Sequence, residues 1–437
     1  MSVLSAMYSG ISGLNANSTA MEVIGNNIAN VNTPGYKGAR ADFSDVLSKT
    51  MAGGFSVGRG SQVADVNQIF SQGAFQATDN VTDLALEGAG FFMVNAPGEE
   101  GSYYTRAGAF LLDSDGYLVN QAGFRVQGFG LGDDGVHTGT PGDIKIDNAP
   151  LPPLATGDGT DGSGINIHLN LDAGADLNPG GASFDINNPD ETSNFVNTIT
   201  VYDSLGNDHQ ISIYYRKTNE DSVNGNTWEW YAVVDADDAA SGTDTIAAQG
   251  SLSFSTEGAL LSETLTSSSF DFAGGATQAQ VIGFDFGESV AEGGTGFTGS
   301  TQFGESSSVA FQGQDGYPPS YLTGLEIGPD GVIVGRYGNG ELVSFAQVAV
   351  ARFNAMNELA QVGGNLYAET QRSGEPIVGV AEEAGNGRIF SNTLELSNVD
   401  IAQQFVEMIT TQRAFQANSR SITTSDEMLT EILNTKR

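Results

Sequence analysis

The chain of 437 residues contains no cysteine. This absence excludes a disulfide framework, a thiolate metal site and any covalent cross-link through sulfur. It is equally compatible with a cytoplasmic protein and with one that is exported unfolded, so it leaves the compartment open.

Basic residues are scarce as well. The chain has 17 Lys and Arg against 53 Asp and Glu, and its formal net charge is −36. Because Lys and Arg dominate phosphate binding, neither nucleic acid nor an anionic membrane is an expected partner. The charge is unevenly distributed, since residues 1–40 carry +1 and residues 397–437 carry −1. The two ends are therefore nearly neutral, and the acidic charge lies between them.

Long apolar runs are also missing. No segment approaches the roughly 20 apolar residues of a membrane-spanning helix. A cleavable signal peptide is not expected, because no Lys or Arg precedes Lys37, and Gly10 and Gly13 interrupt the apolar positions near the start. The hydrophobic content of 39% is nevertheless enough to fill two to four domains.

Apolar residues near the N-terminus recur at spacings of three and four, which is typical of a heptad seam on an α-helix. This helix is predicted to end at residues 32–35, because Pro34 disfavours helical geometry in the residue before it and Gly35 can turn the chain. The seam consists of Leu4, Met7, Ile11, Leu14, Met21 and Ile28.

A second stripe with the same spacing lies near the C-terminus, where neither Gly nor Pro occurs after Gly387. A helix is predicted over roughly residues 398–434, with residues 397–400 forming a capping box in front of it. The stripe consists of Ile401, Phe405, Met408, Phe415, Ile422, Leu429 and Leu433.

Neither helix is expected to be stable alone. Gly10, Gly13 and Gly25 each cost about 1 kcal/mol relative to Ala, and the second helix is rich in Ser and Thr. The pattern leaves two interpretations open. The stripes either close one domain as an intramolecular helical hairpin or form the seam through which copies of the chain assemble.

Both ends resemble a known family. Residues 22–37, EVIGNNIANVNTPGYK, closely resemble the N-terminal signature of the bacterial flagellar rod and hook axial proteins. Residues 397–400 and 412–419 resemble the C-terminal signature of the same family, in the expected order. The signature positions of this chain are Asn26, Asn27, Asn30, Asn32, Pro34, Gly35, Tyr36, Gln412, Arg413 and Asn418.

The middle of the chain indicates which branch of the family is closer. Residues 201–207, VYDSLGN, with Trp228 and Trp230 downstream, resemble the outer domain of the hook members. Rod members are generally shorter and lack a large inserted domain. The resemblance therefore implies a hook subunit, with a distal-rod-like axial protein as the alternative.

The predicted fold class is α+β and multidomain. Long N- and C-terminal helices pair in a coiled-coil-like manner, and two mainly antiparallel β domains are nested by insertion. We expect a terminal helical core domain at residues 1–34 with 397–437. A middle β domain and connector should occupy residues 35–149 with 310–396, and an outer β domain residues 150–309.

No catalytic, cofactor-binding or metal residue is predicted. Asp113, Asp115 and Gly116 match only part of a calcium loop and are better explained as a turn. The three histidines, His137, His168 and His209, lie in separate segments without metal-ligand spacing. The acidic, Gly-rich composition keeps two remote alternatives open, which are an extracellular adhesin or calcium-binding surface protein and a secreted glycan-active enzyme.

The resemblance implies a structural subunit rather than an enzyme. Such a subunit polymerises into the flagellar hook, the curved flexible tube that transmits torque from the rod to the filament. The implied partners are further copies of the chain, the distal rod, the hook cap, the hook-filament junction proteins and the flagellar export gate. The implied location is extracellular, after export without a cleavable signal peptide. Phe43 and Leu47 resemble an export-gate motif, although an amphipathic turn packing on the β domain explains them equally well.

Overall fold

The computed structural model describes residues 3–46, 60–98, 101–132, 137–181 and 183–435. The chain forms two compact units. Unit 1 comprises residues 1–148, 323–336 and 342–437, and unit 2 comprises residues 149–322 and 337–341. The predicted three-part division stays a prediction. Unit 2 extends past residue 309 because β19 (Ser308–Gln314) pairs with β11 (Ile165–Asp172) of the same unit.

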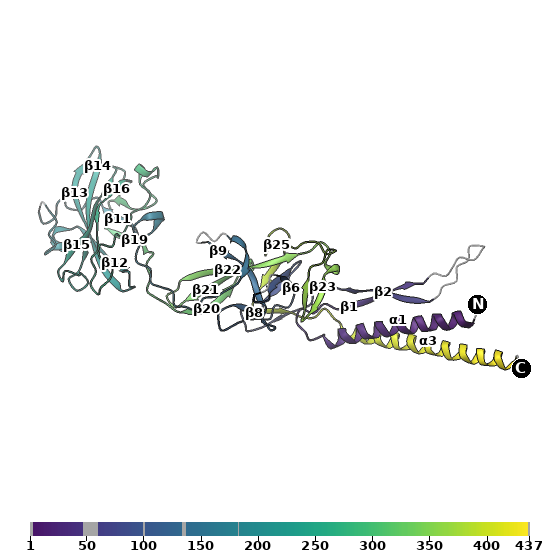
Figure 1. The fold of residues 1–437 in the computed structure, drawn as a ribbon. Coiled ribbons are helices and arrows are strands. Elements are labelled where there is room, and N and C mark those ends of the chain that lie inside the picture. The colour runs from purple at the N-terminus through teal and green to yellow at the C-terminus, as the bar shows by residue number, and fades with distance from the viewer. Residues whose placement is uncertain (1–2, 47–59, 99–100, 133–136, 182, 436–437) are drawn as a thin grey trace. The chain divides into compact units, whose positions relative to one another are not determined.

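The two long helices of unit 1 lie side by side (Figure 1). They are α1 (Val3–Ala29) and α3 (Ile401–Thr435). A Cβ built on Gly10 would lie 2.9 Å from Ile422, whereas Asn27 Nδ2 donates a 3.0 Å hydrogen bond to Gln404 Oε1. The early part of α1 therefore meets the late part of α3, and the helices are antiparallel. None of the described helices is both long and apolar enough to cross a membrane.

The contact face of α1 differs from the predicted stripe by one position. The buried residues of α1 are small or polar with one exception, Ile24. Large residues of the predicted stripe lie beside this face and are half-buried or exposed. The reason is steric, because glycine and alanine let two helix backbones approach closely. The buried face consists of Gly10, Gly13, Ala16, Ala20, Ile24 and Asn27.

Both helix ends correct details of the prediction. α1 ends at Ala29, and hydrogen-bonded turns replace the expected last helical residues. Gly35 has a φ of +68°, and a Cβ there would lie 2.5 Å from the backbone of Ala107, so the position requires glycine. At the other end, Asp400 Oδ1 accepts from Gln403 N at 3.1 Å. Asp400, and not Ser397, therefore caps α3.

A β-hairpin runs along α1. It consists of β1 (Ala39–Asp45) and β2 (Ser61–Gln68), which pair antiparallel with a bulge between Asp42 and Phe43. Ser61 N donates to Ser12 Oγ of α1 at 3.3 Å, and Asn27 forms hydrogen bonds with both the N–H and the C=O of Ala39. The hairpin is thus fixed to α1 near both ends of its paired part.

The rest of unit 1 is β structure around a 12-stranded sheet. β22 (Leu342–Arg352) pairs with β9 (Arg125–Leu131) and β5 (Phe91–Asn95), so residues far apart in sequence share one sheet. Two short ladders join β3 (Phe75–Ala77) to β27 (Thr393–Glu395) and β4 (Ala85–Glu87) to β26 (Arg388–Phe390). The other strands of the sheet are β6 (Ser102–Thr105), β7 (Phe110–Leu112), β8 (Leu118–Asn120), β10 (His137–Asp143), β20 (Leu322–Ile327), β21 (Val332–Tyr337), β23 (Ala360–Gly363), β24 (Leu366–Ala368) and β25 (Ile377–Val380).

Unit 2 packs two sheets against one hydrophobic core. The larger is an antiparallel five-stranded sheet of β12 (Phe195–Tyr202), β13 (Asp208–Asp221), β14 (Gly225–Val234), β15 (Thr245–Phe254) and β16 (Leu260–Ser268). The smaller one places β11 beside β17 (Phe284–Asp285), β18 (Thr301–Phe303) and β19. Short helices are α2 (Pro189–Thr192) and 3-10 turns at Thr160–Gly162, Val290–Glu292 and, in unit 1, Met356–Glu358.

Two neighbouring strands of the larger sheet meet at a turn at residues 203–207. β12 pairs antiparallel with β13, and the inward residues Val201, Ile211 and Ile213 are fully buried. Trp228 and Trp230, the two tryptophans of the chain, lie in the same core. Tryptophan fluorescence therefore monitors the unfolding of unit 2 alone. Helix circular dichroism monitors the unfolding of unit 1, which contains both long helices.

The close helix contact gives a first testable prediction. A Cβ at Gly13 would lie 2.7 Å from Asn418, whereas a Cβ at Gly25 has no neighbour within 4 Å. We expect Gly13→Leu to separate α1 from α3 and lower the hydrogen-exchange protection of both helices. Gly25→Leu should retain that protection and gain up to about 1 kcal/mol of helix propensity. Equal protection in the two variants would contradict the close contact.

Candidate assembly interface

A buried ion cluster lies where the two helices join the β structure of unit 1. Lys37 Nζ contacts Glu395 Oε1 at 2.7 Å, and these side chains are 1% and 0% exposed. Arg106 Nη1 lies 3.7 Å from Glu395 Oε2. Burial lowers the pKa of Lys37, and the hydrogen bond to Glu395 partly offsets this effect. Glu395 is therefore the shared anion of two buried cations.

Backbone groups add further hydrogen bonds to this cluster. Lys37 Nζ also donates to Ser71 O at 2.8 Å, and Gly73 N donates to Glu395 Oε1 at 2.8 Å. Arg106 donates to two carbonyls, Leu86 O at 3.2 Å and Gly88 O at 2.7 Å. The cluster thus connects the segment after α1, the loops of the β region and the segment before α3.

Two signature asparagines belong to the same junction. Asn27 is 3% exposed, and its side chain joins α1 to Ala39, to Gln404 and to the hydroxyl of Tyr36. Asn398, which was not among the predicted site residues, accepts from Gly38 N at 2.8 Å and donates to Ile69 O at 2.6 Å. These amides fix where each helix leaves the β structure.

The remaining signature residues have more varied surroundings. Asn30 Nδ2 donates to Asn26 Oδ1 at 2.8 Å on the surface of α1. Asn418 contacts α1 at Gly13. Pro34 is half-buried, and the exposed side chains are Asn26, Asn32, Gln412 and Arg413.

The structure brings together part of the predicted seam. Met408, Phe415, Ile422 and Leu429 are half-buried on α3. With Gln404, Thr411, Asn418 and Ser425 they form a regular three-four stripe. The contacts of Asn418, Ile422 and Gln404 with α1 show that this stripe lies against that helix. On α1, Met7, Leu14, Met21 and Ile28 are half-buried beside the contact, and Ile11 is exposed. Leu4 and Leu433 belong to the helices, but their side chains lie outside the described residues.

A second set of apolar side chains on α3 faces away from these contacts. They are 44% to 65% exposed in the single chain, which is unusual for such large residues on one helix. On α1, Tyr8 is 65% exposed. Four of the exposed α3 residues lie within about two and a half turns at the start of the helix and are called here the outer face: Ile401, Phe405, Val406 and Ile409. Met428 is exposed near the other end of the helix.

The proposed export motif has a different local structure from the predicted turn. Phe43 lies in strand β1 opposite Val63 and is 52% exposed. The interpretation as an amphipathic turn is therefore wrong for Phe43, because ladder pairing with β2 extends the chain there. Leu47 lies outside the described residues, and a role in export stays a prediction.

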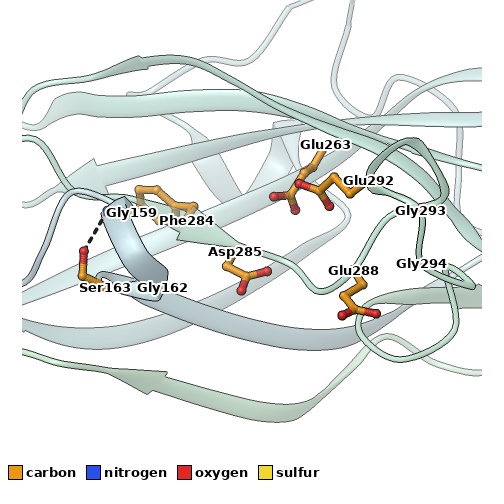
Figure 2. Close-up of a pocket in the computed structure, with 10 residues that line it drawn as sticks. All are labelled: Gly159, Gly162, Ser163, Glu263, Phe284, Asp285, Glu288, Glu292, Gly293 and Gly294. Carbon is orange, nitrogen blue, oxygen red and sulfur yellow. Dashed lines mark hydrogen bonds between the residues drawn. The ribbon is translucent and has the colours of Figure 1, made fainter. Parts of the chain in front are cut away.

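Unit 2 contains an acidic pocket of about 470 Å³ (Figure 2). Its carboxylates are Glu263, Asp285, Glu288 and Glu292. Glu263 Oε2 accepts from Phe286 N at 3.0 Å, and burial raises the pKa of Glu263 to about 7. Glu292 is engaged by both the N–H and the hydroxyl of Ser289. In the described part of the chain, no group of three potential ligands has metal-binding geometry.

Full-length relatives establish the family. The chain is 36% identical to the flagellar hook protein FlgE of Borreliella burgdorferi, over 99% of this chain and 100% of the relative. The chain belongs to the flagellar hook protein family. The hook protein FlgE of Treponema pallidum is 33% identical over 100% of both chains, and that of Salmonella typhimurium is 33% identical over 97% of this chain and 98% of the relative.

Family models divide this hook-family chain along its length. They describe a flagella basal body rod protein segment (residues 7–37), a flagellar hook protein FlgE/F/G D1 domain (85–170), a flagellar basal body protein FlaE D2 domain (170–317) and a flagellar basal body rod FlgEFG protein C-terminal segment (391–435). The crystal structure of the Helicobacter pylori flagellar hook protein FlgE2 has a similar fold. Its TM-score is 0.50 at 16% identity, and the match covers 72% of this chain and 98% of that chain.

These comparisons confirm the resemblance inferred from the terminal signatures, and they confirm the hook branch of the family. The chain is a flagellar hook protein with terminal helices and several β domains. Sequence reasoning missed Glu395, Arg106 and Asn398, because no local pattern marks a buried partner that lies hundreds of residues away.

The buried cluster gives a second prediction. Glu395→Gln leaves two buried cations without their anion, so we expect unit 1 to lose about 3–5 kcal/mol of unfolding free energy. The control is Glu87→Gln, which breaks the 2.6 Å pair with Arg388, whose partners are 46% and 48% exposed. That change should cost less than about 1 kcal/mol. Helix circular dichroism during urea unfolding measures the loss of unfolding free energy in each variant. Equal losses in Glu395→Gln and Glu87→Gln would contradict the role of the buried cluster.

The acidic pocket gives a third prediction. The pKa of Glu263 is about 7 in the folded chain against an ordinary value of 4.5, so the folded state binds the proton more tightly. The stability of unit 2 should therefore fall as pH rises from about 4.5 to 7. Glu263→Gln should stabilise unit 2 by about 1–2 kcal/mol at pH 8 and have little effect at pH 4.5.

Tryptophan fluorescence during urea unfolding at the two pH values measures this difference. Glu288→Gln is the matched control, because Glu288 lines the same pocket but is exposed. The Glu263→Gln effect should differ more between the two pH values than the effect of this control. A Glu263→Gln effect that is the same at both pH values would contradict the assignment.

Proposed function

We propose that copies of this chain polymerise into the flagellar hook, the curved flexible tube that transmits torque from the rod to the filament. The observation that carries the proposal is the apolar outer face of α3 on a chain of the hook family. Apolar side chains of this size each gain about 1.5–3 kcal/mol when they are removed from water. A neighbouring copy provides such an environment.

The contact between α1 and α3 supports the same proposal. Because small and polar residues make up most of the buried face of α1, the contact uses few of the large apolar residues of that helix. The predicted seam residues of α1, which lie beside the contact, and the outer face of α3 remain available for contacts between copies. Contacts between two different surfaces that do not close on themselves generate a helical filament, and a tube is one such filament.

The proposed role is structural and does not involve catalysis. Unit 1 would supply the helical contacts of the tube, and unit 2 would supply contacts at which neighbouring copies adjust their packing. The proposed partners, besides further copies, are the distal rod, the hook cap, the hook-filament junction proteins and the export gate. The proposed location is the extracellular hook, reached by export without cleavage of a signal peptide.

Substitution on the outer face tests polymerisation. Phe405 is 49% exposed in the single chain, so Phe405→Asp should change the unfolding free energy of the monomer by less than about 1 kcal/mol. In the tube it would bury an unpaired charge, and we expect polymerisation to fail. Phe405→Leu, which stays apolar, should retain it. Sedimentation and electron microscopy measure assembly, and normal tubes from Phe405→Asp would refute a role for this face.

A further inference from the structure

The surface of unit 2 is almost entirely of one charge. Its residues 149–322 and 337–341 include 25 Asp and Glu but only two Lys and Arg, which gives a formal net charge of −23. The two cations are Arg216 and Lys217, and they are 0% and 1% exposed. No basic side chain therefore interrupts the acidic surface of this unit.

The two cations are held in the interior by their own contacts. Arg216 donates to the side chain of Asn178 and to the carbonyl of Gly181. Lys217 Nζ donates to Ala173 O at 2.7 Å and to Glu220 Oε2 at 3.0 Å. Since these contacts are part of the fold of unit 2, the cations cannot turn outward to neutralise a neighbouring surface.

Unit 1 has a different surface. Exposed ion pairs join Arg388 to Glu87, Arg372 to Glu358 and Arg336 to Glu326. Charges of both signs are thus interspersed there, which limits long-range repulsion between like surfaces. A surface that carries acidic but no Lys or Arg side chains is therefore a feature of unit 2 and not of unit 1.

We propose that unit 2 repels the unit 2 of a neighbouring copy until cations of the medium screen its charge, so that ionic strength controls how closely copies pack. The inference rests on the proposed polymerisation, which brings copies together. The range of this repulsion is set by the Debye screening length, which is about 30 Å at 0.01 M salt and about 3 Å at 1 M salt. At low salt the units repel before they touch, whereas at high salt the repulsion acts only at contact.

Five exposed acidic residues allow the charge to be changed without disturbing known contacts. Among the described residues, their side chains take part in no hydrogen bond or ion pair. Replacing all five by Asn or Gln changes the net charge of unit 2 from −23 to −18, and replacing them by Lys changes it to −13. The five residues are Asp176, Asp237, Glu257, Glu288 and Glu305.

The matched control exchanges Asp for Glu and Glu for Asp at the same five positions, which perturbs the side chains but preserves the charge. The critical concentration for polymerisation of each full-length chain is measured by sedimentation between 0.01 M and 1 M NaCl. For the native chain and the control we expect it to fall about tenfold or more as salt rises. The Asn/Gln variant should show a smaller fall, and the Lys variant less than about threefold.

Static light scattering of the unpolymerised chains supplies a second measurement, the second virial coefficient. At 0.01 M NaCl this coefficient should be most positive for the native chain and the control, in which the net charge of unit 2 is −23. It should be lower for the Asn/Gln variant (−18) and lowest for the Lys variant (−13). The same salt dependence in all four chains, in either measurement, would overturn the inference. If no chain polymerises at any salt concentration, the proposed function fails, whereas the virial coefficients still decide whether unit 2 repels its copies.

Discussion

The buried contact of Glu395 with Lys37 and Arg106 is the interaction on which the arrangement of unit 1 depends. Placing charges in the interior is unfavourable, and only close pairing with further hydrogen bonds offsets that cost. Glu395 meets this requirement for Lys37, at 2.7 Å and with Gly73 N as a further donor to the same oxygen. Arg106 lies 3.7 Å from the other oxygen and donates to two backbone carbonyls instead. Because Lys37 follows α1 and Glu395 precedes α3, the cluster sets the place from which both helices leave the β structure.

Once both helices start from one place, the residues between them decide how closely they pack. Gly10 and Gly13 bring the backbone of α1 onto Ile422 and Asn418 of α3, and Asn27 hydrogen-bonds Gln404 near the other end. An ordinary two-helix hairpin buries its largest apolar residues in the contact. Here several of them are exposed on the outer face instead. The two interpretations that the sequence left open are therefore compatible, since an intramolecular hairpin and a surface for further copies use different faces of the same helices.

The sequence predicted the existence of both long helices and the family. It was less accurate about the face of α1 that meets α3, because counting large apolar residues assumes that size determines burial, whereas Gly10 and Gly13 are buried for their small size. The pairing of β19 with β11, which carries unit 2 past residue 309, joins residues about 140 apart and has no local signature in the sequence. The partnership of Lys37 with Glu395 was not predictable for the same reason, since local periodicity carries no information on contacts of that range.

The distribution of charge separates two kinds of contact between copies that respond to salt in opposite ways. Arg413 and Arg420 are exposed on α3, as are Asp426 and Glu427, so contacts through unit 1 can include ion pairs, which salt weakens. The proposed contacts through unit 2 would bring acidic surfaces together, and salt would relieve their repulsion. Apolar contacts of the outer face depend on neither effect. An increase in ionic strength should therefore leave the apolar contacts of the helices in place while allowing unit 2 of adjacent copies to approach, which would change the packing of copies without dissociating them.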